Sequence, residues 1–102
     1  MNTEDQNIFT LLKEVIDPEL MVNIIDLGLV YGVRLDKDKK EIVIDLTLTS
    51  PGCPLGEVII EDAQQIISKI YPNFKVKVNL VWEPAWSLKN LTPEGRIALG
   101  SV

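Results

Sequence analysis

Histidine is absent from the 102-residue chain, and cysteine occurs once, as Cys53. The chain by itself therefore excludes a catalytic pair of cysteine and histidine, a zinc site with histidine ligands, and acid–base catalysis by imidazole. One cysteine forms no internal disulfide and cannot supply the four thiolates of a self-contained metal cluster. Any metal held by Cys53 needs further ligands from a second subunit, a small thiol, a carboxylate or another protein.

Basic residues are also scarce, with ten Lys and Arg against fifteen Asp and Glu and a formal net charge of -5. This balance leaves no basic stripe for phosphate contacts. No segment approaches the roughly 18 apolar residues of a membrane helix, and the opening "MNTEDQNIF" lacks the basic and apolar parts of a signal peptide. The single cysteine fits a reducing compartment. We therefore expect a cytoplasmic protein that binds neither nucleic acid nor membranes.

Hydrophobic residues make up 46% of the chain and charged residues 25%, which is typical of a folded globular domain. A chain of this length has enough core for one domain, so we expect a single domain over residues 1–102.

The first half of the chain predicts a helix followed by a hairpin. Apolar residues at helical spacing predict a helix of about four turns that Pro18 closes; they are Ile8, Leu11, Leu12, Val15 and Ile16. The period then changes to two: Leu29, Tyr31, Val33 and Leu35 are expected on one face of a strand. The turn "DKDKKE" leads into a second alternating strand over residues 42–48.

The second half predicts a helix, a strand and a short helix. The longest apolar stripe lies in residues 55–70, and alternation in residues 74–82 predicts a third strand with a solvated face. A right-handed crossover would lay this strand parallel to the second. Thr92 is a suitable N-cap for a helix with Pro93 at its first position. The expected fold is a small α+β two-layer sandwich in the order α-β-β-α-β-α, with helices on one face of a mixed three-stranded sheet and a polar opposite face.

The segment "LTLTSPGCPLGEVII" carries the cysteine between a strand and a helix. If the helix begins near Pro54, Cys53 lies at or next to its N-cap, where free N–H groups and the helix dipole favour a thiolate. Pro54 suits the first helical position, and Gly52 allows a sharp turn. The alternative is that Cys53 is a small buried hydrophobe, and the pattern alone leaves both interpretations open.

Two further segments carry candidate site residues. Asp17, Glu19 and Asp26 precede the first strand and could be metal ligands, helix-capping groups or acceptors for loop N–H groups. Trp82 ends the predicted third strand, and Trp86 lies beyond it. The favoured interpretation is that they fix the C-terminal segment to the core, and the alternative is a partner surface.

Four motifs occur in one order: "DPEL" at 17–20, "NIIDLGLVYGV" at 23–33, "LTLTSPGCPLG" at 46–56 and "VWEPAW" at 81–86. With "LTPEGRIALG" near the end, they resemble the SufT/PaaD family, also called MIP18-like. That family is similar in fold to the C-terminal domain of NifU, which uses a C-x-x-C pair; here Ser50 stands where the first cysteine would fall. PaaD-type members carry a cysteine-bearing C-terminal extension that this sequence does not show, so the SufT-like resemblance is the better one.

The resemblance implies a factor that matures iron–sulfur proteins, as a carrier or a targeting adaptor, and not an enzyme. Cys53 would transiently ligate iron or an iron–sulfur cluster, shared across a possible homodimer or with a client. Asp17, Glu19 and Asp26 would shape or complete the site, and Thr49, Gly52 and Pro54 would position the loop. The expected partners are iron–sulfur assembly proteins and apo-protein clients. Two alternatives stay open: a thiol enzyme in which Cys53 attacks a peroxide, disulfide or acyl group, and a protein-binding adaptor with a structural cysteine.

Overall fold

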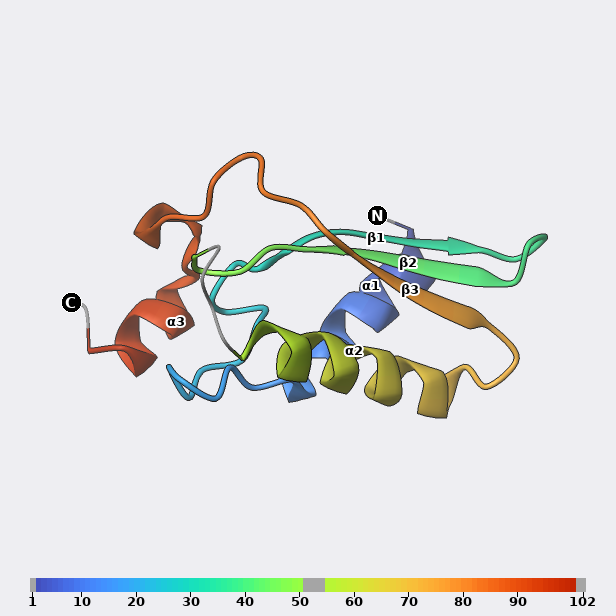
Figure 1. Ribbon diagram of the computed structural model, residues 1–102, viewed down its shortest axis with the longest axis horizontal. Helices are drawn as coiled ribbons and strands as arrows, with labels where there is room; N and C mark the ends of the chain where they lie inside the picture. Colours follow the sequence, from blue (N-terminus) through green and yellow to red (C-terminus); the bar gives the residue numbers. More distant parts are fainter. Residues whose placement is uncertain (1, 51–54, 101–102) are drawn as a thin grey trace.

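The computed structural model describes residues 2–50 and 55–100. Along the chain its elements are α1 (Thr3–Leu11), a 3-10 turn η1 (Leu12–Glu14), β1 (Val30–Asp36), β2 (Glu41–Leu46), α2 (Gly56–Ile70), β3 (Lys75–Leu80), a 3-10 turn η2 (Leu88–Asn90) and α3 (Pro93–Ala98) (Figure 1). The α+β class and the order of helices and strands are as predicted. In the described ranges, no helix is long and apolar enough to cross a membrane.

The three strands form one mixed sheet in the order β1-β2-β3. The hairpin pairs β1 antiparallel to β2, and the connection through α2 returns the chain so that β3 is parallel to β2. Helices α1 and α2 lie on the same side of the sheet (Figure 1). This confirms the predicted two-layer arrangement.

The core lies between these helices and the sheet, and β2 is its centre. Ile42, Ile44 and Leu46 of β2 are fully buried, and their alternation explains why this segment forms a strand with one apolar face. The helices contribute Ile8 and Leu12 from the first helical segment and Ile59, Ala63 and Ile67 from α2. Burial of each large aliphatic side chain contributes about 1.5–3 kcal/mol to stability.

The first helix ends earlier than predicted. Its α-helical part stops at Leu11, η1 stops at Glu14, and Val15 has an extended backbone. The Ile24 N–H donates to the Val15 C=O at 3.0 Å, so the chain folds back on itself here. Ile16 is therefore 42% exposed and not part of a helical stripe. The predicted end at Pro18 is wrong because pairing between two loop segments ends the helix first.

A register shift between Val30 and Gly32 interrupts the alternation of β1. Val33 lies opposite Ile44 on the core face, whereas Gly32 lies opposite Asp45 on the outer face. Tyr31 is the extra residue, so the prediction that it shares a face with Val33 is wrong. Its hydroxyl donates at 2.7 Å to the carbonyl oxygen of Pro84. The predicted polar outer face is thus partly covered by the C-terminal segment.

Candidate functional site

The cysteine segment joins the end of β2 to the start of α2. Gly52, Cys53 and Pro54 lie outside the described residues, so their predicted roles stay predictions. Helix α2 begins at Gly56 with Leu55 as its N-cap, and the Leu55 side chain makes no capping bond. The helix thus begins two residues after Pro54, and Cys53 stands two residues before the N-cap in the sequence.

Gly56 fixes how closely α2 approaches the residues that follow β2. A Cβ added to Gly56 would lie 2.6 Å from Cδ1 of Leu48, which is closer than side-chain atoms pack. Both residues are buried. The two ends of the cysteine segment are therefore anchored on a packed contact between Leu48 and Gly56.

Two threonines precede the cysteine segment. Thr49, predicted to position the loop, is half-buried. Thr47 is 1% exposed, and its Oγ1 has no hydrogen-bond partner in the described parts of the chain. A buried hydroxyl without a partner is unusual in a folded protein. Thr47 lies one residue beyond the end of β2, so the alternation of the strand does not determine its burial.

Asp17 organises a tight turn. Its side chain is buried, and Oδ1 accepts the backbone N–H groups of Glu19 at 2.8 Å and Leu20 at 3.1 Å. The turn ends at Met21, which has a positive φ of 59° and is 75% exposed. Of the three interpretations left open for Asp17, this geometry favours an acceptor for loop N–H groups. Glu19 lies exposed on the same turn.

Asp26 connects the loop before β1 to α3. One carboxylate oxygen accepts the Thr92 hydroxyl at 3.0 Å, and the other accepts the Asn23 side-chain amide at 2.8 Å. The Thr92 N–H donates to the Asp26 C=O at 3.0 Å, and Thr92 Oγ1 caps α3 by accepting the Gly95 N–H. The structure therefore brings Asp26 to the N-cap of α3, a contact that the sequence did not predict.

These carboxylates do not form a metal centre among the described residues. Over residues 2–50 and 55–100, no group of three or more Cys, Asp and Glu side chains is arranged to hold a metal ion. Asp17 and Asp26 use their oxygens on backbone and side-chain donors. Asp17 and Asp26 therefore stabilise the loops before β1, and the described residues do not by themselves provide a ligand set.

The two tryptophans lie in different surroundings. Trp86 is half-buried, and its indole N–H donates to the Leu27 C=O at 2.6 Å. This bond fixes the C-terminal segment to the loop before β1, in line with the favoured interpretation. Trp82 is 41% exposed. A partner surface at Trp82 therefore stays a prediction.

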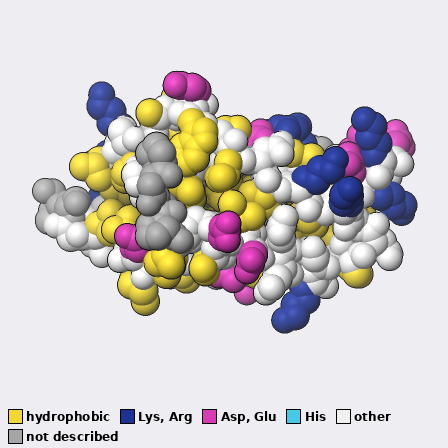
Figure 2. All heavy atoms as spheres, viewed as in Figure 1, with side chains coloured by type: hydrophobic (Ala, Val, Ile, Leu, Met, Phe, Trp, Pro, Cys, Tyr) yellow, Lys and Arg dark blue, Asp and Glu magenta, His cyan; other side chains and the backbone are white. Residues whose placement is uncertain are grey.

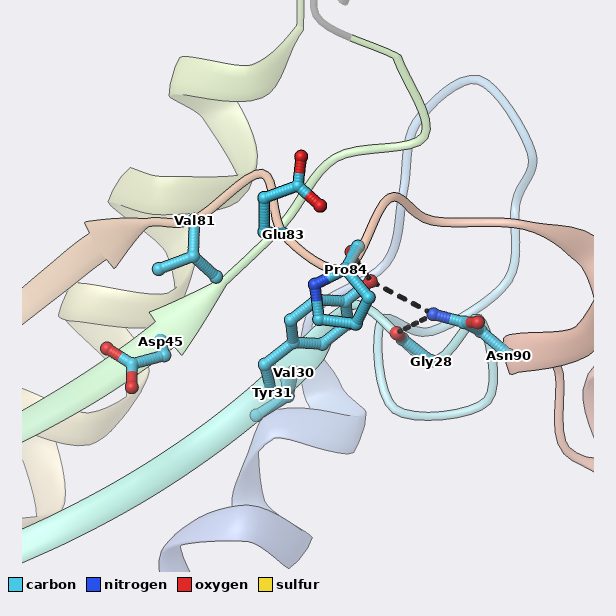
Figure 3. A pocket seen from close by; sticks show the side chains of 8 residues that line it. All are labelled: Gly28, Val30, Tyr31, Asp45, Val81, Glu83, Pro84 and Asn90. Carbon is cyan, nitrogen blue, oxygen red and sulfur yellow. Dashed lines mark hydrogen bonds between the residues drawn. The ribbon is translucent and has the colours of Figure 1, made fainter.

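A cavity of about 630 Å³ opens where this C-terminal segment crosses the sheet (Figure 3). Its lining includes Tyr31, Asp45, Glu83, Pro84 and Asn90. The Asn90 amide donates to the Tyr31 hydroxyl at 3.1 Å and to the Gly28 C=O at 3.4 Å. Sequence reasoning missed this cavity because it depends on the register shift in β1 and on a segment far away in the chain.

The charge at the cavity is set by an ion pair across two strands. Arg34 Nη1 donates to Asp45 Oδ2 at 2.8 Å. This hydrogen bond is the main reason why the pKa of the Asp45 carboxyl lies below its ordinary value; burial opposes the shift, and the positive charge of Arg34 adds to it. The side chain of Asn79 also donates to Asp45, at 3.4 Å. The Asp45 carboxylate therefore accepts hydrogen bonds from side chains of both neighbouring strands.

Comparison with known proteins places this scaffold in a family. The sequence model described as "Iron-sulfur cluster assembly protein" matches residues 5–80, and the chain belongs to that family. It is 39% identical over 95 residues to the Fe-S protein maturation auxiliary factor YitW of Bacillus subtilis, covering 93% of this chain and 92% of the relative. It is 43% identical over 86 residues to the Fe-S protein maturation auxiliary factor SufT of Staphylococcus aureus, covering 84% and 97%.

A solved structure supports the same assignment. The crystal structure of a domain of unknown function from Bacillus anthracis is 40% identical to this chain and superposes with a TM-score of 0.88. The match covers 94% of this chain and 91% of that one. The observed α+β sandwich is therefore the fold of this family.

Proposed function

We propose that this protein is a cytoplasmic factor in the maturation of iron–sulfur proteins, and that it acts by transient binding rather than by catalysis. The observation that carries the proposal is the family match over residues 5–80, together with relatives above 35% identity that are named Fe-S protein maturation auxiliary factors. The cargo would be iron or an iron–sulfur cluster, and the partners would be assembly proteins and apo-protein clients.

In this proposal Cys53 is the residue that ligates the cargo. It is the only thiol in the chain, and thiolates are the usual ligands of iron–sulfur clusters. Because the chain has only one thiol, the remaining ligands would come from a second copy, a small thiol, a carboxylate or a client. A cluster that is shared in this way is released easily, which suits a carrier.

Anaerobic reconstitution with iron and sulfide tests the proposal. Visible absorption, bound iron and oligomeric mass would be measured together for the wild type and for Cys53→Ser. We expect absorption that depends on Cys53, at about one cluster per two chains, because one chain cannot supply four thiolates.

Position 50 offers a matched pair of variants. Ser50 is exposed and lies three residues before Cys53. Ser50→Cys creates a C-x-x-C pair, so two chains would then supply four thiolates and hold a cluster without added small thiol. Ser50→Ala is the control and should bind cargo as the wild type does. If shared ligation is correct, only Ser50→Cys slows the loss of the cluster to a chelator.

Two results would contradict the carrier role and favour another function. If iron and sulfide binding is the same in Cys53→Ser, the carrier version fails, and the protein would be a targeting adaptor whose partners are found by affinity capture. If Cys53 instead reacts rapidly and saturably with a peroxide or a thioester, the protein would be a thiol enzyme.

A further inference from the structure

The apolar layer of the sheet continues beyond its last described strand. Strand β3 pairs in register with β2, so that Val76, Val78 and Leu80 lie beside Ile42, Ile44 and Leu46. The three β2 side chains are fully buried, whereas Val76 and Val78 are only half-buried and Leu80 is 41% exposed. On the neighbouring helix, Ile70 is 56% exposed. The helix-facing side of β3 therefore offers an apolar shelf next to α2.

The backbone of β3 is open along the edge that faces away from β2. The N–H of Lys75 donates to Lys40 and the N–H of Val81 donates to Leu46, so odd-numbered residues direct their N–H groups toward β2. Backbone groups alternate along a strand, and those of Val76, Val78 and Leu80 point away from β2. No strand lies beyond β3 in the described part of the chain, so these groups form an open edge.

The positive charge along β3 favours an acidic partner strand at this edge. Its outward-facing side chains are Lys75, Lys77 and Asn79, and the strand carries no acidic residue. Lys77 contacts Glu41 at 2.8 Å, and its side chain is still 46% exposed. Figure 2 shows Lys and Arg side chains gathered toward the hairpin end of the molecule. A second copy of β3 would place lysines near lysines, and like charges on paired strands are destabilising.

From these three observations we infer that the free edge of β3 binds an extended acidic segment of a partner protein, which adds a strand to the sheet. The segment would alternate in character. Its apolar side chains would cover the shelf formed by Val76, Val78 and Leu80, and its Asp or Glu side chains would lie opposite Lys75 and Lys77. Main-chain bonds would provide affinity, and the alternating side chains would provide specificity.

A synthetic peptide tests the inference on the full-length protein. The probe is a capped seven-residue peptide with alternating valine and glutamate, and the matched probe replaces each glutamate by lysine. We expect NMR shift changes concentrated in residues 75–81 with the glutamate peptide. A peptide N-methylated at the amides that face the edge should lose binding, because it cannot complete the ladder.

Two variants of the protein complete the test. Lys75→Glu combined with Lys77→Glu should weaken the glutamate peptide about tenfold, since two cross-strand charge pairs become repulsive. Val78→Pro should also weaken it, because proline removes an N–H that points to the open edge and not to β2. Circular dichroism spectra would check that both variants fold.

Four outcomes would overturn the inference: equal binding of the lysine peptide, shift changes away from β3, binding that survives N-methylation, and a single-stranded oligonucleotide that competes as well as the peptide. Self-association abolished by Val78→Pro would instead assign the edge to a second copy of this chain, and would also overturn it.

Discussion

At the scale of single residues, Thr47 is the clearest departure from ordinary packing. Its hydroxyl is buried and has no partner in the described ranges. Thr47→Val replaces the hydroxyl by a methyl group of similar shape and removes the cost of burying an unpaired polar group. We expect the free energy of unfolding to rise by about 1 kcal/mol, measured by urea denaturation.

Thr92 provides the matched contrast. Its hydroxyl donates to Asp26 and accepts the Gly95 N–H, so it is fully used. Thr92→Val removes an N-cap and should lower the free energy of unfolding by about 1 kcal/mol. If Thr47→Val lowered the free energy of unfolding as much as Thr92→Val does, the Thr47 hydroxyl would have a partner in the folded protein.

At the scale of elements, α3 is positioned by a backbone contact that only glycine permits. A Cβ on Gly95 would overlap the carbonyl oxygen of Asp26 and lie 3.0 Å from the carbonyl carbon. Helix propensity favours alanine over glycine by up to about 1 kcal/mol. The overlap outweighs this gain, because a backbone carbonyl cannot move aside as a side chain can. Gly95→Ala should therefore destabilise the protein, by about 1–3 kcal/mol.

The melting temperature of Gly95→Ala, measured beside the exposed control Glu94→Ala, checks this expectation. Fluorescence from Trp86 reports the contact directly, because its indole N–H bonds to Leu27 in the loop on which α3 packs. An unchanged melting temperature with unchanged fluorescence would mean that α3 is not held by this contact.

The outer face of the sheet predicts a pH dependence. Arg34 lowers the pKa of Asp45 in the folded state, so the pair stabilises the fold above the ordinary aspartate pKa of about 3.9, and the stabilisation is lost as pH falls through the lowered value. Asp45→Asn should cost about 0.5–1 kcal/mol at pH 7. The difference between wild type and variant should be smaller at about pH 3 than at pH 7, because protonation of Asp45 removes the ion pair.

Urea denaturation at both pH values measures this difference. Asp38→Asn, on the exposed hairpin turn, is the control and should show a much smaller effect at either pH. A cost for Asp45→Asn that stays constant as pH falls would mean that the pair with Arg34 does not contribute.

The number, type and order of these elements follow from the sequence because apolar periodicity is a local property. Their ends do not. The first helix stops where Val15 bonds to Ile24, and the row of β1 side chains changes at Tyr31, whose hydroxyl donates to Pro84. Both contacts link residues beyond the reach of one helical or strand period, so no local pattern encodes them.

The same limit applies to the candidate site. Cys53 could be singled out because it is the only thiol. The acidic residues could be found in the sequence, but their roles could not. A carboxylate that accepts backbone N–H groups and a carboxylate that binds a metal look the same in a sequence. Asp26 shows this, because its partner Thr92 lies near the other end of the chain.

At the scale of the whole molecule, the structure predicts two levels of local stability. Strand β2 is central in the sheet and its inward side chains are fully buried. The short helix α3 packs on the loop around Asp26, and its exposed residues include Ile97 at 72%. Elements with few buried apolar contacts open at a lower free energy than the global transition.

Native-state hydrogen exchange would measure both levels. The amide of Leu99, the C-cap residue of α3, donates to Gly95 and should exchange through an opening at least about 2 kcal/mol below the global free energy. The amides of Ile42 and Ile44 should exchange only by global unfolding. Thr92→Val should speed exchange in α3 more than in β2. Equal protection at both places would mean that the C-terminal segment unfolds with the sheet, and that the loop around Asp26 and the β2 core form one cooperative unit.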